Sequence, residues 1–210
     1  MPDVQPARHW VFGYGSIIED ASRNATLGAS GGAHPSAFVE LSSAAGFVRE
    51  WCFRAPSGFT ALGLRRCPAD VAQDVCGVVF ETGNAAALAA FDLREAGYER
   101  VRLDARHLRL YAGATSSGGA ATVRTALEAA TLAGPESSHH AFWAYVPLEP
   151  HPPSEEHPIC QTYLDVCVSG CLDAGGRAAA LQWVRTTGGW SQYWLNDAPM
   201  SRRPWLHRPR

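Results

Sequence analysis

The sequence contains no lysine, and all 18 basic residues among its 210 positions are arginine. A Schiff-base intermediate or a lysine nucleophile is therefore excluded, because arginine replaces lysine in neither role. A long apolar run is also missing. The longest clean stretch, Val75 to Phe80, is far shorter than the roughly 20 residues that a membrane-spanning helix needs. We therefore expect no membrane span.

Neither sign of charge is concentrated along the chain. The 18 arginines are scattered and balanced by 20 acidic residues, which leaves a formal net charge of −2. A nucleic-acid or anionic-lipid partner needs a basic patch, so we expect neither. The first ten residues, MPDVQPARHW, lack the basic start and apolar block of a secretory signal. The expected location is therefore cytoplasmic.

The six cysteines include no C-x-x-C pair, which argues against a zinc or dithiol site. Cys160, Cys167 and Cys171 fall on one apolar helical face and are expected to pack in the core. Two histidine groups, His139-His140 and His151 with His157, lack the helical i, i+4 spacing of a zinc site. We expect no metal and no cofactor.

The chain has the composition of one globular domain, with 46% apolar and 10% aromatic residues. Short β-rich segments separated by turn residues predict a curved sheet or barrel. Strands are expected at 9–12, 37–41, 46–54, 60–65, 75–81, 98–111 and 141–146, helices at 85–96, 159–172 and 177–185, and loops at 19–35 and 113–119.

The helix expected at 85–96 places a carboxyl group on an apolar stripe. Leu88, Phe91 and Glu95 stand at i, i+3 and i+7, so they share one face. Asn84 is a plausible N-cap and Gly97 a plausible stop. Burial and the helix C-terminus both raise the pKa of a carboxyl, whereas pairing with Arg94 would lower it. Glu95 is thus either a general base or a solvated helix-end glutamate.

A glycine turn, Gly13-Tyr14-Gly15-Ser16, follows the first expected strand. It lacks the third glycine of a dinucleotide fingerprint, because Ile18 occupies that position. It also lacks the glycine two residues before Ser16 that a nucleophile elbow requires. Two interpretations remain: an ordinary tight turn, or a turn whose backbone N–H groups face an anion or a carbonyl oxygen.

Two segments together, Trp10-Val-Phe-Gly-Tyr-Gly-Ser-Ile-Ile18 and Phe91-Asp-Leu-Arg-Glu-Ala-Gly-Tyr98, resemble the signature segments of the γ-glutamylcyclotransferase superfamily, including its ChaC-like branch. A third segment, Pro158-Ile-Cys-Gln-Thr-Tyr163, resembles the start of that family's late helix. With the expected helix that continues from Tyr163, the three segments span residues 10 to 172 in the family's order. The sequence departs from the pattern at Ile17, where members usually carry Leu or Asn, and at Glu19, where tryptophan is common in the glutathione-acting ChaC-like branch.

The resemblance implies an α+β fold, a mixed β-barrel flanked by helices. It implies cyclisation of a γ-glutamyl amide or peptide, with glutathione as one possible substrate, to 5-oxoproline. Glu95 is then the catalytic acid/base, and the small-molecule substrate is held by the following residues: Tyr14, Gly15, Ser16, Ile17, Ile18 and Tyr163.

Two other functions remain open: a non-catalytic module that binds a small amine-bearing ligand, and a cyclotransferase for γ-glutamylamines in a biosynthetic pathway. The expected domain organisation is an N-terminal tail (1–8), one domain (9–187) and a Trp/Arg-rich extension (188–210) that packs on the domain. The preferred leaving group and the oligomeric state do not follow from the sequence.

Overall fold

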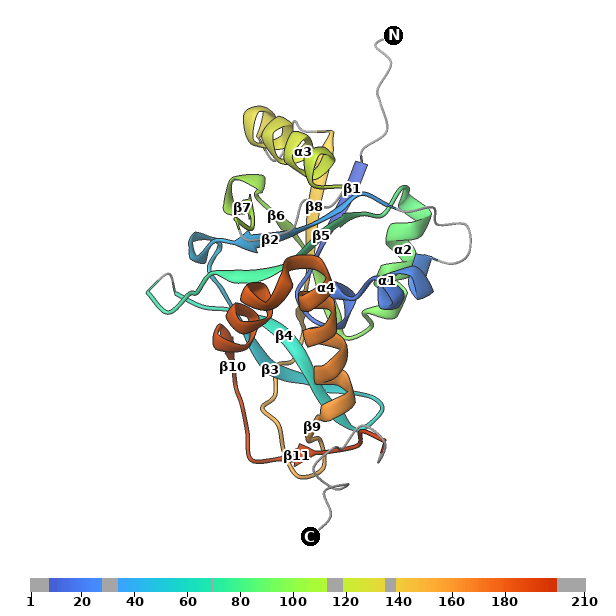
Figure 1. Ribbon diagram of the computed structural model, residues 1–210, viewed down its shortest axis with the longest axis vertical. Helices are drawn as coiled ribbons and strands as arrows, with labels where there is room; N and C mark the ends of the chain where they lie inside the picture. Colours follow the sequence, from blue (N-terminus) through green and yellow to red (C-terminus); the bar gives the residue numbers. More distant parts are fainter. Residues whose placement is uncertain (1–7, 28–33, 69, 113–118, 135–138, 200–210) are drawn as a thin grey trace.

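A computed structural model describes residues 8–27, 34–68, 70–112, 119–134 and 139–199. Its central element is a mixed six-stranded sheet with the order β6-β8-β1-β5-β2-β7 (Figure 1). These strands are β1 (Arg8–Gly13), β2 (Ser36–Leu41), β5 (Val75–Glu81), β6 (Tyr98–Leu103), β7 (Leu108–Leu110) and β8 (His140–Pro147). β1 runs parallel to β8, and the other neighbours are antiparallel. Every residue of the apolar strand β5 is buried, as expected for a central strand.

A second, smaller sheet lies beside the first. It contains β3 (Phe47–Ala55), β4 (Phe59–Arg66) and β10 (Thr187–Gly188), and a two-stranded pair joins β9 (Ile159–Cys160) to β11 (Trp194–Leu195). β4 approaches the end of β8 at Gly63, where an added Cβ would lie 2.3 Å from Pro147 Cγ. The two strands touch there, but no hydrogen-bonded register joins them.

The expected α+β class with mixed sheets is therefore confirmed. The expected barrel is wrong, because the sheets of the described residues do not close into one. Short strands and turns in a sequence indicate where strands occur. They do not determine which edges pair, because lateral pairing depends on contacts between distant segments.

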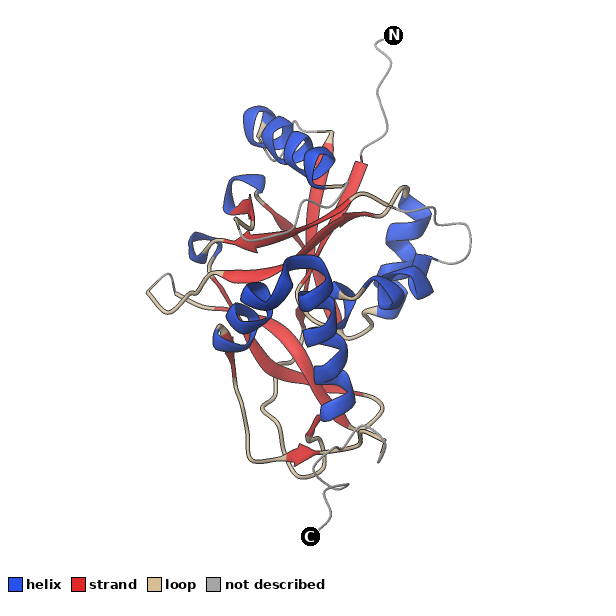
Figure 2. Ribbon diagram, in the orientation of Figure 1, coloured by secondary structure: helices blue, strands red, loops and turns tan. Residues whose placement is uncertain are grey.

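Helices flank the sheets (Figure 2). They are α1 (Asp20–Leu27), α2 (Ala85–Arg94), α3 (Ala120–Ala133) and α4 (Gln161–Arg185). The expected caps of α2 are confirmed: the Asn84 side chain accepts a hydrogen bond from Ala87 N, and Gly97 has a φ of 95°. α4 crosses the front of the molecule between the two larger sheets, and α1 and α2 lie together at one side (Figure 1).

Several expected elements differ from the structure. The expected loop 19–35 contains α1, and α3 was not predicted. The expected strand 98–111 is divided into β6 and β7 by a short 3₁₀ turn, Ala105–His107, in which Asp104 caps the turn by accepting from Arg106 N. The two expected late helices are confirmed: α4 consists of two helical parts, which Gly176 separates with a non-helical φ of 73°.

The cysteines of the late segment pack in the core, as expected. Cys167 and Cys171 are fully buried, Cys160 is buried, and all three thiols are free. Burial raises the pKa of each thiol, so none is activated as a thiolate.

The expected domain boundaries stay predictions. The boundary after residue 187 falls inside β10, and Trp190 of the extension packs against Trp51 with ring centroids 5.4 Å apart. Some expected features lie outside the described residues. They are most of the expected tail (1–7), part of the loop 19–35 (28–33), most of the loop 113–119 (113–118) and the end of the extension (200–210). None of the helices in the described part of the chain has the length and apolar character to cross a bilayer.

Candidate functional site

The glycine turn directly follows β1 and enters a short 3₁₀ helix, Ser16–Ile18. Two contacts from α4 hold it: Trp183 Nε1 donates to Tyr14 O at 3.1 Å, and the Tyr163 hydroxyl lies against Gly15. An added Cβ at Gly15 would lie only 2.9 Å from that hydroxyl oxygen. A larger residue at this position would therefore have to displace the Tyr163 hydroxyl.

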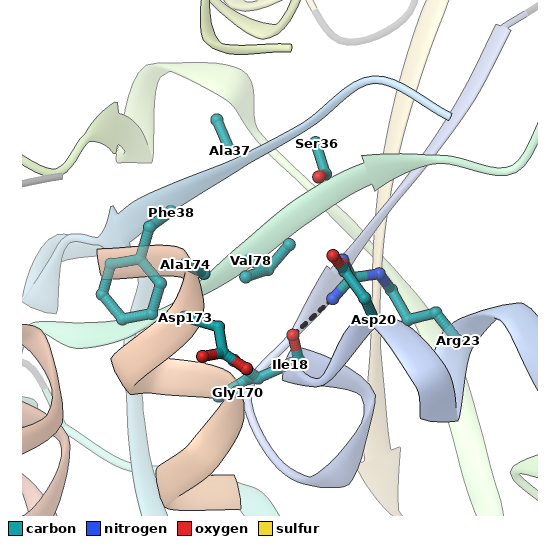
Figure 3. A pocket seen from close by; sticks show the side chains of 10 residues that line it. All are labelled: Ile18, Asp20, Arg23, Ser36, Ala37, Phe38, Val78, Gly170, Asp173 and Ala174. Atoms are coloured by element: carbon teal, nitrogen blue, oxygen red, sulfur yellow. Dashed lines mark hydrogen bonds and ion pairs between the residues drawn. The ribbon is translucent and has the colours of Figure 1, made fainter. Parts of the chain in front are cut away.

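This turn forms one wall of a cavity. The lining residues come from the turn, β4, the α2–β6 junction, β8 and the first turn of α4; they are Tyr14, Gly15, Ser16, Ile17, Leu62, Glu95, Tyr98, Tyr145 and Tyr163. Six of the seven site residues expected from the sequence are thus brought together. The seventh, Ile18, lines a separate cavity with Arg23 and Gly170 (Figure 3).

Three residues of the lining were not among those expected from the sequence: Leu62, Tyr98 and Tyr145. Tyr98 is the last residue of the segment Phe91–Tyr98 that resembles the family, so the sequence could have indicated it, although no role was assigned to it. Tyr145 lies in an expected strand, but its neighbours Ala144 and Val146 are also apolar and buried, so no alternation in the sequence indicates which face it occupies. Leu62 carries no sequence signal, because β4 reaches the site only through tertiary packing.

Glu95 ends α2 and holds its carboxyl group inside the cavity wall. Its backbone N donates to Phe91 O at 2.8 Å, and its side chain is only 17% exposed. Leu88 and Phe91 are buried on the same stripe, as the spacing predicts. Burial raises the pKa of the Glu95 carboxyl above its ordinary value, while Arg94, with Nε 3.2 Å from Oε1, opposes the rise.

The remaining polar side chains of the cavity are mainly tyrosines held by hydrogen bonds. Tyr14 donates to Tyr145 O at 2.6 Å and Tyr98 donates to Leu62 O at 2.8 Å. The Tyr163 hydroxyl accepts from Leu62 N at 3.4 Å. Burial, with the nearby Glu95 charge as a smaller cause, raises the pKa of Tyr14, Tyr98 and Tyr163 well above the usual range. These phenols therefore stay neutral, and Glu95 is the acidic member of the lining.

The site has the features of proton-transfer chemistry on a small molecule. It offers one buried carboxyl, neutral hydroxyl groups and the backbone of a glycine turn. The described residues contain no cluster of three or more His, Cys, Asp or Glu side chains that could bind a metal ion.

Comparison with solved structures gives matches over nearly the whole chain. A structure described as "Gamma-glutamyl cyclotransferase" aligns with a TM-score of 0.52 at 12% identity, covering 95% of this chain and 98% of the other. An uncharacterized protein from Homo sapiens gives the same score and identity, with coverage of 96% and 99%. YkqA from Bacillus subtilis also scores 0.52 at 12% identity, covering 85% of this chain and 53% of its own.

No protein-family model and no curated protein matches the sequence. The likeness to solved structures at 12% identity concerns the fold. It confirms the sequence resemblance at that level: the chain has the fold of the gamma-glutamyl cyclotransferase structures.

Proposed function

We propose that the protein is a γ-glutamylcyclotransferase, which closes the γ-glutamyl group of an amide or peptide to 5-oxoproline and releases the attached amine. The observation that carries this proposal is the buried Glu95 carboxyl. It shares a small cavity with the Gly15-Ser16 turn and four neutral phenols, and it pairs with Arg94. The fold of the gamma-glutamyl cyclotransferase structures supports the same reaction class.

In this reaction the nucleophile belongs to the substrate. The α-amino nitrogen attacks the γ-carbonyl carbon, a C–N bond forms within a five-membered ring, and the C–N bond to the leaving amine breaks. Intramolecular attack supplies an effective molarity of about 10⁵ M or more when the orientation is good. The protein then needs neither lysine nor a covalent nucleophile.

Glu95 is proposed to carry the proton between the two nitrogens. As a carboxylate it accepts the proton from the α-ammonium group, and as a carboxylic acid it returns it to the leaving amine. Burial suits both steps, because it brings the two protonation states of the carboxyl closer in free energy at neutral pH.

The turn is proposed to stabilise the oxyanion that forms on the γ-carbonyl. Backbone N–H groups of Gly15 and Ser16 are the candidate donors, since both residues line the cavity. The Tyr163 hydroxyl lies against Gly15 and lines the same cavity, so it is placed to contact the substrate. Tyr14 and Ile17 complete the wall that holds the γ-glutamyl group. For Ile18 we propose support of the turn, because its side chain lines the other cavity.

The test is to incubate the protein with glutathione, a γ-glutamyl dipeptide and a γ-glutamylamine, and to measure 5-oxoproline. We expect release from at least one substrate and a loss of about 10²-fold or more in Glu95→Gln. Glu99→Gln is the matched control, because Glu99 is exposed on β6 four residues away. Unchanged turnover in Glu95→Gln would refute the mechanism.

The three substrates also separate the alternatives. Release from the γ-glutamylamine alone would favour a biosynthetic γ-glutamylamine cyclotransferase over a glutathione-acting enzyme. No release from any of them, with binding still detected by calorimetry, would favour a non-catalytic binding module.

A further inference from the structure

Arg94, the residue before Glu95, joins three parts of the molecule. Its Nη1 donates to Ser22 O at 2.5 Å and to Thr26 Oγ1 at 2.6 Å, and its Nη2 donates to Ser22 Oγ at 2.8 Å. The same Nη2 lies 3.4 Å from Ser16 Oγ. Its Nε faces the Glu95 carboxyl at 3.2 Å. All three guanidinium nitrogens therefore have a partner.

These contacts fix the guanidinium plane. Ser22 and Thr26 stand four residues apart on α1, so they lie on one face of that helix and hold the same edge of the guanidinium. A guanidinium is planar and rigid, so fixing one edge also fixes the direction of Nε. The carboxyl that Nε faces is thereby oriented within the cavity wall.

α1 is itself bonded to the short 3₁₀ helix Ser16–Ile18, which continues the glycine turn. Arg23, only 5% exposed, donates from Nη1 to Ile17 O at 3.0 Å and to Ile18 O. Its guanidinium also lies over the Phe80 ring, 5.2 Å from the centroid. The turn and the carboxyl are therefore held against the same helix, each through a different arginine.

We propose that Arg94 is a positioning residue, through which α1 sets the orientation and the proton affinity of Glu95 relative to the glycine turn. This inference rests on the proposed function, since it assigns Glu95 the proton transfer. The inference goes beyond the proposed function because it assigns a role in catalysis to α1 and Arg94, neither of which lines the cavity.

The charged and titratable groups facing Glu95 come from five elements. Arg94 of α2 is the cation, and the others are phenols: Tyr14 after β1, Tyr98 of β6, Tyr145 of β8 and Tyr163 of α4. Burial and neighbouring charges raise the pKa of each phenol, so these groups stay neutral while Glu95 titrates. Arg94 is then the group whose removal raises the pKa of Glu95 further.

The experiment compares the pH dependence of kcat in the wild type, Arg94→Met, Arg94→Lys and the double variant Ser22→Ala/Thr26→Ala. Arg106→Met is the matched control, because Arg106 also pairs with a carboxylate but lies outside the site. The titration of Glu95 is followed in parallel by carbon NMR of its carboxyl, assigned by comparison with Glu95→Gln. Thermal melts check that each variant folds.

Arg94→Met is expected to move the acid limb of the kcat profile and the NMR titration to higher pH. It is also expected to lower the plateau kcat by roughly tenfold to hundredfold, because the carboxyl is no longer held in place. Arg94→Lys and the double variant keep the positive charge, so they lower kcat with a smaller shift of the limb. Arg106→Met is expected to match the wild type.

The proposal would be overturned if Arg94→Met kept the wild-type pH profile of kcat and the wild-type titration of Glu95. It would also be overturned if Arg106→Met shifted both as far as Arg94→Met does. If Arg94→Met fails to fold, the lysine and double variants decide: unchanged kcat in both would overturn it. If the wild type releases no 5-oxoproline, the proposed function fails. The NMR titration of Glu95 then still decides whether Arg94 sets its proton affinity.

Discussion

At the scale of the residue, the Glu95 carboxyl links stability to pH. Its pKa is raised in the folded protein, so between the ordinary value of about 4.3 and the folded value the folded state binds more protons than the unfolded chain. Its contribution to stability is therefore complete at low pH and is lost as the pH rises through the folded pKa. At neutral pH the buried carboxylate costs stability.

Replacing Glu95 by glutamine removes this cost. We expect the free energy of unfolding of Glu95→Gln at pH 7 to equal or exceed that of the wild type, and its decline between pH 4 and 7 to be weaker. Urea denaturation across this pH range measures both. A variant that is clearly less stable at pH 7 would show that Glu95 stabilises the fold through its ion pair with Arg94.

At the scale of the element, α2 positions Glu95 in the cavity wall because both ends of the helix are fixed. The Asn84 side chain accepts from Ala87 N at 2.9 Å at one end, and Gly97 ends the helix in a left-handed conformation at the other. The chain then turns so that Tyr98, the first residue of β6, also points into the cavity. One helix and its stop thus place two residues of the site.

We expect Asn84→Ala to lower the free energy of unfolding by about 0.5–2 kcal/mol, because the Ala87 N–H loses its capping acceptor. Asn84→Ser keeps an acceptor and is expected to lose less. Denaturant titration measures the difference. Because the cap lies at the end of α2 opposite Glu95, kcat should stay near the wild-type value, and a large loss of kcat would contradict this division of roles.

The elements differ in how well they were predicted, because some depend on neighbouring residues and others on contacts with distant parts of the chain. α2 has an alanine- and leucine-rich sequence with a cap at each end, so its start, and its end to within two residues, follow from neighbouring residues. α1 has the polar sequence DASRNATL, which resembles a loop. In the structure its Arg23 and Ser22 are held by the turn and by Arg94, contacts that no local pattern indicates.

At the scale of the whole molecule, a fully buried arginine joins the two larger sheets. Arg49 of β3 donates to Cys76 O of β5 at 2.6 Å, to Trp183 O of α4 at 2.7 Å and to Thr187 Oγ1 of β10 at 2.9 Å. Its guanidinium also stacks on the Trp183 ring at 4.7 Å. Since Trp183 also holds the turn through Tyr14 O, this cluster connects the sheets to the site.

We expect Arg49→Met to lower the free energy of unfolding by at least about 3 kcal/mol, because buried carbonyl oxygens of β5 and α4 lose their donors. Arg65→Met is the matched control. Arg65 pairs with Glu50 on the surface of the same sheet, and such pairs contribute about 1 kcal/mol or less. Denaturation curves of the two variants give the comparison, and similar losses would contradict a special role for Arg49.

The sequence by itself determined most strand positions, the start of α2 and the stripe that buries Glu95, because these features depend on periodicity, capping and turn residues within a few positions of one another. The α+β class followed from the resemblance of three segments to a known family. Only the tertiary structure decided that the sheets stay open, that Leu62 and Tyr145 join the site, and that α1 holds Arg94. Each of these depends on contacts between segments far apart in the chain, whose partners are selected by packing of the whole molecule.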